Sequence, residues 1–266
     1  FSLENSGVRG RMVRLGSVLT DIMQQHNYPP PVSSLLSEVL TLCLLLSAML
    51  KYEGTFSLQI KGSGVIRTLM ADVTSSGEVR AYAGFDEAAV KKAARRRGGK
   101  ETGENHYHLL GTGYMAFTVD QGGDSRYQGI VELKGGSIVE AAQHYLTQSE
   151  QIRTSFKMAV HPQDNYLRAG GIMIQQLPDP NAAHDAEPDI EDWTRAAMLL
   201  STCSEGEILS PVLHSADVLY RLFHEEGVRV FTPVHVRFKC RCSHEKVVDI
   251  LRTIPRREME EACAKE

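Results

Sequence analysis

The feature of this chain that most constrains its fold is a long apolar segment, residues 32–51, that follows three consecutive prolines. Proline suits the first turn of a helix, because the N–H group that it lacks would have no helical partner there. The residues that follow are strong helix formers, and they are apolar on nearly every face rather than along one stripe. We therefore expect a central core helix that the rest of the fold covers on all sides.

The chain is long enough to bury such a helix and to form more than one structural unit. It has 266 residues, of which 42% are hydrophobic, and a net charge of -4. Its longest apolar run, residues 39–50, lies between Glu38 and Lys51 and is well short of the roughly 20 residues that cross a bilayer. We expect no membrane span and no secretory signal. Five unevenly spaced cysteines argue against a secreted disulfide framework and indicate a reducing compartment, so we expect a cytoplasmic protein.

After the apolar segment the pattern changes to a period of two, which is typical of strands. Phe56, Leu58 and Ile60 alternate with polar residues, and turns rich in glycine and serine lead into residues 65–73 and 78–85. These three segments predict a β-meander. The pattern as a whole predicts an α+β fold with a largely antiparallel sheet packed by helices. Further strands are predicted at residues 114–120, 127–133, 156–161 and 170–176, and a helix at residues 137–147.

A change of composition near Pro178 predicts a domain boundary. Residues 177–192 are rich in proline, aspartate and alanine, which is typical of a connection between structural units. We expect the chain beyond this boundary to be mainly helical.

Two amphipathic helices are predicted in that second region. Trp193, Ala197 and Leu200 recur at helical spacing, and a second helix is predicted between Ser215 as its N-cap and Gly227 as its terminator. Amphipathic helices are not stable alone, so their apolar faces must lie on the core domain or on a partner. They are either ordinary packed helices or a clamp that can be displaced.

Two cysteines one residue apart, Cys240 and Cys242, narrow the function more than any other residues. Two thiolates on one tight turn can hold a soft metal ion such as zinc, or they can oxidise onto each other. Metal binding requires the thiolate form, so a zinc ion held here would suppress oxidation until an oxidant reached the sulfur. A site with this chemistry can act as a redox switch between a zinc-bound state and an oxidised state.

The zinc site is incomplete in this chain, because tetrahedral zinc needs four ligands and no C-x-x-C pair follows Cys242. His244 and Cys263 are the nearby candidates for further ligands, although both fit solvated helix faces better. We expect the missing ligands to lie beyond Glu266.

Six short segments, of which the last two are the most specific, occur in order along essentially the whole chain. They are Val8-Arg9-Gly10, Gly111-Thr112-Gly113-Tyr114, Arg126-Tyr127-Gln128-Gly129, Ala169-Gly170-Gly171, Val218-Leu219-Tyr220-Arg221-Leu222-Phe223-His224-Glu225-Glu226 and Phe238-Lys239-Cys240-Arg241-Cys242-Ser243. Together they resemble the 33 kDa chaperonin family of redox-regulated heat-shock holdases.

The resemblance implies an ATP-independent chaperone that binds unfolding client proteins under oxidative stress. It implies a core chaperone domain at residues 1–178, a helical linker at residues 179–233 and a partial zinc and redox-switch domain at residues 234–266. In that family four cysteines, a C-x-C and a later C-x-x-C, bind zinc when reduced and form two disulfides when oxidised. Zinc loss unfolds the switch and linker, and the active form is a homodimer. Only Cys240 and Cys242 can be carried over as zinc ligands and redox-active residues.

We expect clients to bind apolar surface that is uncovered when the linker helices leave the sheet, because exposed contiguous apolar area captures non-native chains without sequence preference. The residues at or under that surface are Trp193, Leu199, Leu200, Leu219, Leu222 and Phe223.

Features of two other classes of protein can be compared with this sequence. A zinc-assisted nucleic-acid-binding protein would use the basic residues 91–97 and Lys100, followed by His106 and His108, to grip phosphates. The acidic net charge and the single tryptophan argue against it. An enzyme finds little support, because neither G-x-x-x-x-G-K-[ST] nor G-x-S-x-G occurs, and thiol oxidoreductases usually carry C-x-x-C at a helix start. Here C-x-C follows a strand-like segment, residues 234–238. We expect no catalytic residue, and we give Cys203 no redox role.

Overall fold

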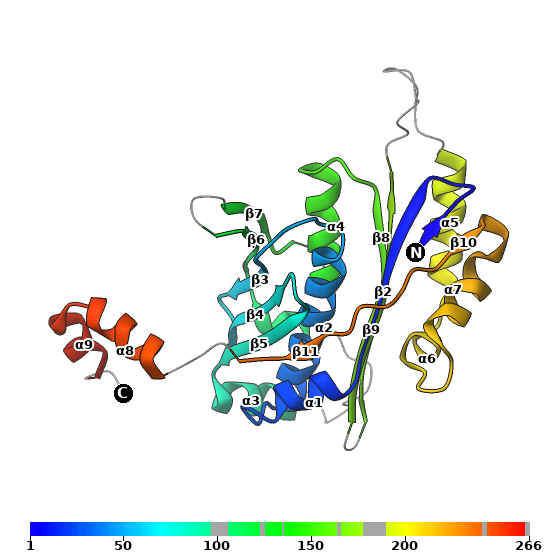
Figure 1. The fold of residues 1–266 in the computed structure, drawn as a ribbon. Coiled ribbons are helices and arrows are strands. Elements are labelled where there is room, and N and C mark those ends of the chain that lie inside the picture. The colour runs from blue at the N-terminus through cyan, green and yellow to red at the C-terminus, as the bar shows by residue number, and fades with distance from the viewer. Residues whose placement is uncertain are drawn as a thin grey trace.

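Helix α2 (Pro30–Ser47) lies between two β-sheets in the computed structural model, which describes residues 1–96, 106–122, 126–134, 136–163, 166–177, 190–240 and 244–263 (Figure 1). Side chains on all of its faces are buried, so the prediction of a central core helix is confirmed. The helix ends earlier than predicted, with Ala48 as its C-cap. Its last turn tightens into shorter-range bonds, such as the one from Met49 N–H to Leu46 O at 3.1 Å.

Among the described residues, α2 is the one helix that is long and apolar enough to cross a membrane. However, 72% of this segment is buried inside the fold. The two sheets therefore cover the apolar surface that a bilayer would otherwise cover.

The first sheet has the strand order β10-β1-β2-β9-β8 and is antiparallel throughout. Its two faces both carry apolar side chains, as alternation along β9 shows: Met173 packs around α2, whereas Ile172 and Ile174 pack in a second cluster on the opposite face. The strands are β1 (Ser2–Leu3), β2 (Val8–Leu15), β8 (Thr154–Gln163), β9 (Tyr166–Gln176) and β10 (Val228–Arg229).

The second sheet has the order β11-β5-β4-β3-β6-β7 and contains the predicted meander as β3, β4 and β5. All its neighbours are antiparallel except β11, which runs parallel to β5. The predicted strand at residues 234–238 is wrong in length, because only Arg237 and Phe238 pair with β5, while Val234 has no neighbouring strand and is 83% exposed. The strands are β3 (Thr55–Gly62), β4 (Ile66–Thr74), β5 (Glu78–Phe85), β6 (Gly113–Asp120), β7 (Arg126–Glu132) and β11 (Arg237–Phe238).

Of the other helices, α4 (Ile138–Gln148) packs beside α2 and contacts both β8 in the first sheet and β7 in the second. The predicted helix at residues 137–147 is confirmed as α4, and Ser137 is its N-cap, because its Oγ accepts the N–H of Glu140 at 3.1 Å. The N-cap of α7 is His214 and not Ser215, since His214 has the extended backbone that precedes a helix and Ser215 is already helical. These helices are α1 (Ser17–Met23), α3 (Glu87–Arg96), η1 (Tyr107–Leu110), α4 (Ile138–Gln148), α5 (Ile190–Thr202), α6 (Glu205–Leu209), α7 (Ser215–Phe223), η2 (His224–Glu226), α8 (His244–Thr253) and α9 (Arg256–Cys263).

Helices α5, α6 and α7 form a layer on the face of the first sheet that points away from α2 (Figure 1). Gly227 ends this helical region with a left-handed backbone, φ 67°, as predicted. Of the predicted boundary segment, residues 177–192, residues 178–189 lie outside the described residues, and residues 190–192 already belong to α5.

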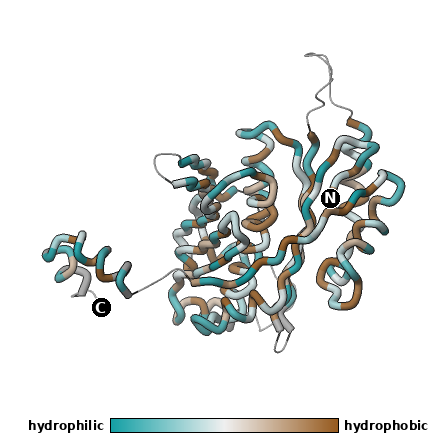
Figure 2. Tube along the Cα trace, in the orientation of Figure 1, coloured by the Kyte–Doolittle hydropathy of each residue, from teal (hydrophilic) through white to brown (hydrophobic). Residues whose placement is uncertain are grey.

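Residues 230–236, which we call the strap, carry the chain from β10 in the first sheet to β11 in the second (orange in Figure 1). Helices α8 and α9 follow. Figure 2 shows that they are mainly hydrophilic, in contrast to α2 and the strands around it.

Candidate functional site

Cys240 lies two residues after the end of β11 and is exposed. Backbone hydrogen bonds hold the strand that precedes it: the N–H of Arg237 donates to Gly77 O and the N–H of Lys239 donates to Val79 O, both at 3.0 Å. Cys242 lies outside the described residues. The thiol of Cys240 is therefore presented to solvent at the point where the chain leaves the second sheet.

Glu78 fixes the end of this strand through charge. Its Oε1 accepts from Arg237 Nη2 at 2.9 Å and from Lys239 Nζ at 2.7 Å. The side chain of Glu78 is only 12% exposed, whereas both cations are largely exposed. The hydrogen bond from Lys239, followed by that from Arg237, lowers the pKa of Glu78 below its ordinary value.

The described residues do not complete a metal site. Cysteine thiolates suit zinc, but tetrahedral zinc needs four ligands, and no group of three or more metal-binding side chains occurs in the described ranges. Of the other predicted candidates, His244 is the first residue of α8 and Cys263 is the last residue of α9. The C-x-C pair thus offers at most two of the ligands required.

The six apolar residues predicted for the client surface all lie in one cluster beneath the α5–α7 layer. Leu200, Leu219 and Phe223 are almost completely buried, and Trp193, Leu199 and Leu222 pack at its edge. Opposite them lie apolar side chains of the first sheet. These are Phe1, Leu3, Val8, Ala159, Ile172 and Ile174.

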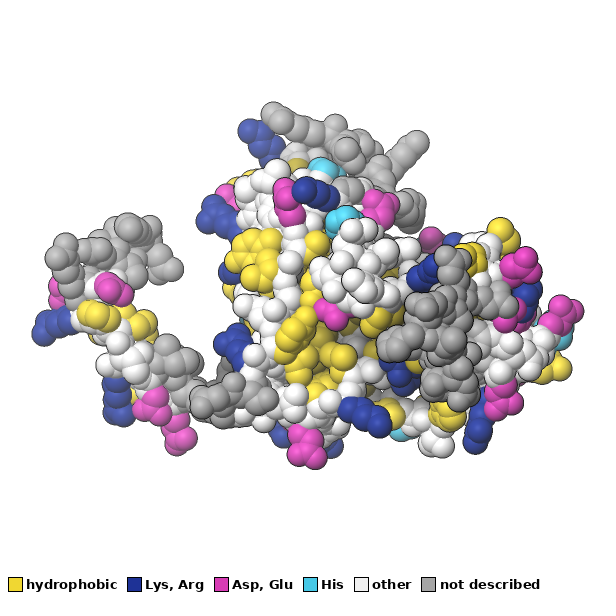
Figure 3. Space-filling view, turned by 90° about the horizontal axis from the view of Figure 1, so that it is seen from above, with side chains coloured by type: hydrophobic (Ala, Val, Ile, Leu, Met, Phe, Trp, Pro, Cys, Tyr) yellow, Lys and Arg dark blue, Asp and Glu magenta, His cyan; other side chains and the backbone are white. Residues whose placement is uncertain are grey.

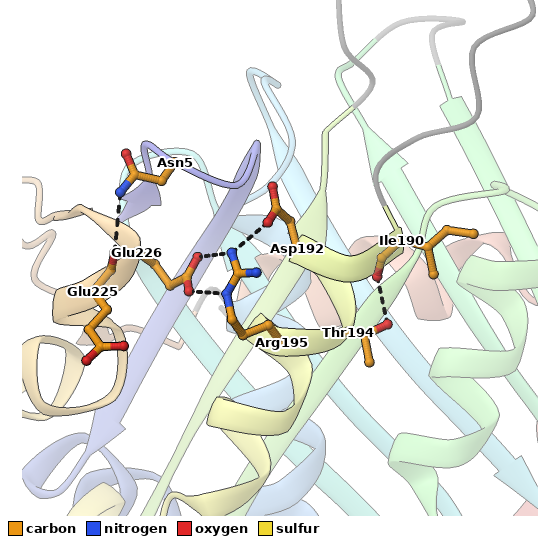
Figure 4. Close-up of polar contacts among 7 residues, drawn as sticks. All are labelled: Asn5, Ile190, Asp192, Thr194, Arg195, Glu225 and Glu226. Carbon is orange, nitrogen blue, oxygen red and sulfur yellow. Dashed lines mark hydrogen bonds and ion pairs between the residues drawn. The ribbon is translucent and has the colours of Figure 1, made fainter.

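A polar pair closes the end of this layer. The guanidinium of Arg195 on α5 contacts both carboxylate oxygens of Glu226, at 2.5 and 3.0 Å, and also Asp192 Oδ1 at 2.6 Å (Figure 4). Glu226 is only 3% exposed, and the hydrogen bond from Arg195 lowers its pKa. The same segment is fastened to the loop after β1, because Asn5 Nδ2 donates to Glu225 O at 3.3 Å.

A second polar contact ties α6 to the first sheet. Arg14 on β2 donates from Nη2 to Glu207 O at 2.6 Å, from Nε to Ile208 O at 2.7 Å, and from Nη1 to Leu213 O. One guanidinium therefore satisfies three carbonyl groups at and beyond the end of a short helix, where no helical N–H is available.

Sequence reasoning missed Arg14, Arg195 and Glu226. Glu226 stands in one of the segments that carried the family resemblance, but its role depends on Arg195, which lies on another helix of the same layer and 31 positions earlier in the chain. Arg14 is one of three arginines in β2, so its charge alone does not single it out. Neither feature of the sequence identifies the groups that Arg14 or Glu226 contacts.

The strap is loosely packed on the core. A groove of about 980 Å³ lies between the strap and the end of α2. Phe231 and Val234 on the strap line this groove and are 51% and 83% exposed. Two apolar side chains on a segment without sheet pairing thus already face solvent.

The two other described thiols are buried. Burial raises the pKa of Cys203 to about 11 and raises that of Cys43 well above its ordinary value. Cys43 Sγ donates to Ala71 O at 3.4 Å inside the core. Both thiols stay protonated at neutral pH and are poor targets for oxidants.

The basic cluster of the nucleic-acid hypothesis falls partly on α3. There Lys91 pairs with Glu87 at 2.5 Å, and both side chains are exposed. Residues 97–105 lie outside the described residues. In the described part of the cluster, the charge of Lys91 is thus already paired.

Comparisons with known proteins agree on one family. A family model described as Hsp33 protein matches residues 1–266. The 33 kDa chaperonin of Caulobacter vibrioides is 37% identical over 256 residues, which cover 93% of this chain and 81% of that protein. The 33 kDa chaperonin of Salmonella typhimurium is 33% identical over 266 residues, which cover 100% of this chain and 85% of that protein. A crystal structure of the 33 kDa chaperonin from Thermotoga maritima has the same fold, with a TM-score of 0.74 at 23% identity, covering 98% of this chain and 86% of that one.

Proposed function

Because the chain belongs to the Hsp33 family, we propose that it is a redox-regulated, ATP-independent chaperone of the holdase type, which binds unfolding client proteins under oxidative stress. The name of its relatives, 33 kDa chaperonin, supports a chaperone function. We place the protein in the cytoplasm, as a homodimer in its oxidised form, and assign it no catalytic activity.

The observation that carries this proposal is the layer formed by α5, α6 and α7, whose apolar cluster is distinct from the cluster around α2. The layer covers an apolar face of the first sheet, and α2 supports the opposite face of that sheet without any contribution from the layer. Lifting the layer would therefore expose apolar area on both surfaces while the α2 core stays packed. Exposed contiguous apolar area of this kind binds non-native chains.

We propose that the chain is divided into three parts: a core chaperone domain at residues 1–178, a helical linker at residues 179–233 and a partial redox-switch domain at residues 234–266. The pairings of β10 and β11 add a physical connection between these parts. Because the strap joins the two short strands, a change beside Cys240 acts on a segment that is hydrogen-bonded to both sheets.

Cys240 and Cys242 are the proposed redox residues. Peroxide would oxidise the two thiols to one disulfide and would itself be reduced to two molecules of water, with the two thiol protons included in that water. Zinc, when bound, would hold the sulfurs as thiolates, with Cys240 and Cys242 as two of its four ligands.

Oxidation acts on the chain next to β11. A bridge across one intervening residue constrains the backbone at residues 240–242, directly after the two hydrogen bonds and the Glu78 ion pairs that hold β11. Loss of those contacts releases the strap, and the α5–α7 layer then keeps only its own packing and the contacts of Arg14 and Arg195. We propose that this sequence of events uncovers the client surface.

The test is suppression of the aggregation of a thermally unfolding protein, measured with and without peroxide. The full chain should protect after peroxide treatment and lose that gain in the double variant Cys240→Ser, Cys242→Ser. Cys203→Ala is the matched control, because it removes a buried thiol that is not expected to react. If peroxide changes the protective capacity of neither the parent nor the double variant, redox control of this chaperone is wrong.

A further inference from the structure

A small, partly open pocket lies between the two sheets at the end of α2 and is not used by the proposed chaperone function. Its volume is about 150 Å³. The pocket lies near the end of β9, and that end of the strand is at the top of Figure 1. Figure 3 views the molecule from above and shows apolar side chains gathered in the middle of this face. Most of its wall is apolar. The main contributors are Leu46, Met49, Phe56, Phe117, Leu146 and Ile152.

One wall of the pocket carries a charged side chain, Arg9. Along β2, Val8 packs under the α5–α7 layer, so alternation directs Arg9 to the opposite side, toward α2. Its Nε is buried and makes no hydrogen bond with any part of the chain that the structure describes. Its cross-strand partner on β9 is Gln175, a second polar lining residue, which is only 3% exposed.

The acidic group at the pocket does not satisfy Arg9. Glu150 Oε1 instead accepts the hydroxyls of Tyr127 at 2.8 Å and Tyr145 at 2.7 Å. No described carboxylate oxygen lies within 4.0 Å of the guanidinium nitrogens of Arg9. Arg9 therefore forms no ion pair with Glu150 or with any other described acidic residue. The positive charge therefore remains available to a ligand.

The walls of the pocket are held in place by packing. The ring of Tyr145 stacks on Phe117 with the centroids 4.8 Å apart. Gly129 on β7 makes room for it, because a Cβ there would lie 2.0 Å from Tyr145 Oη. A preformed pocket loses little entropy when a ligand binds.

We propose that this pocket binds a small organic monocarboxylate, with its carboxylate on Arg9 and its apolar body against the wall around Met49. A cavity of this size in an apolar core accommodates a benzene ring. A buried N–H without a partner is unfavourable, and a carboxylate that accepts from a guanidinium restores a strong, charge-assisted hydrogen bond. Hydrophilic anions such as phosphate do not match the apolar wall, and long-chain fatty acids exceed the volume.

Binding of benzoate to the full chain, followed by isothermal titration calorimetry, tests the proposal. Benzoate should bind at least about tenfold more tightly than benzamide, which has the same shape without the charge. Arg9→Met should abolish this preference, whereas Arg67→Met, which removes an exposed arginine on β4, should leave it unchanged. Equal binding of benzoate and benzamide, or an unchanged preference in Arg9→Met, overturns the proposal.

A second measurement locates the ligand without any variant. Benzoate should shift the methyl resonance of Met49, which lines the pocket, and leave that of Met198, which is 64% exposed on α5, in place. Shifts of equal size at both methionines would mean non-specific binding and would contradict the proposed site. Neither measurement depends on peroxide or on client proteins, so the result is independent of the redox-chaperone proposal.

Discussion

Arg195 on α5 and Glu226 at the end of the helical layer form a two-point ion pair in which the carboxylate is almost fully buried and the guanidinium is half exposed. The pair joins the first turns of the layer to its last residues, so it closes α5 and α7 into one unit on the sheet. A mutation of this pair should therefore affect the α5–α7 layer and not the core around α2.

Glu226→Gln should loosen the layer while leaving the α2 core intact. A neutral amide cannot replace the charge-assisted contacts with Arg195, and the guanidinium keeps only Asp192. We expect several-fold faster hydrogen exchange in α5 and α7 and measurable protection of clients without peroxide.

The matched control for this change is Glu225→Gln, because the neighbouring carboxylate is 86% exposed and its side chain does not contact Arg195. If both variants exchange at the parent rate, the ion pair does not hold the layer.

Acidification should weaken the layer in the same way. The pKa of Glu226 is lowered in the folded state by Arg195, so its contribution to stability is present above the unfolded pKa of about 4.3 and is lost as the pH falls through the lower folded value. Binding of a hydrophobic dye, recorded from pH 6 downward, should rise in the parent below about pH 4.3. This component of the rise should be missing from Glu226→Gln, which has no carboxyl group to protonate.

Arg14→Met should detach α6 from the first sheet. The change leaves the carbonyls of Glu207, Ile208 and Leu213 without their donor, and we expect a loss of about 2 kcal/mol in the free energy of unfolding of the layer. Denaturant titration followed by the fluorescence of Trp193, the single tryptophan, measures it. Arg14→Lys keeps the charge but not the fork of donors, so it should recover only part of the loss. Full recovery by lysine would show that charge alone is sufficient.

Glu78→Gln should free the strap end next to the C-x-C pair. Without the carboxylate, Arg237 and Lys239 lose their shared partner, and only the two backbone hydrogen bonds hold β11. We expect several-fold faster exchange of the amides of Arg237 and Lys239 and faster reaction of Cys240 with peroxide.

Glu87→Gln, which removes an exposed carboxylate paired with Lys91, is the control for that experiment. Unchanged exchange of both amides in Glu78→Gln would show that the ion pairs do not fasten the strap.

Much of the fold could be predicted because its signals are local. The apolar segment that became α2 and the alternation in β3 each depend on residues a few positions apart. The strand β2 was not predicted, because Arg9, Arg11 and Arg14 interrupt its apolar alternation. Its pairing with β9 and the hydrogen bonds of Arg14 give it a place that no short window of sequence contains.

The same contrast between local patterns and long-range contacts holds for the candidate site. The apolar cluster under the layer was predicted, since helical spacing alone selects Leu200, Leu219 and Phe223. The polar contacts that hold the layer were not, because Arg195 and Glu226 belong to different helices and meet only through the packing of both on the sheet. The roles of Cys240 and Cys242 remain predictions.

The parallel pairing of β11 has one more physical effect: it covers the open side of β5. Strand edges with unsatisfied backbone groups recruit extended polypeptide. If β11 departed, the carbonyls of Gly77 and Val79 would lose their donors at once, and the second sheet would gain a vacant rim suited to an incoming extended segment. Release of the strap would thus expose an apolar surface on the first sheet and, at the same time, an unpaired strand edge on the second.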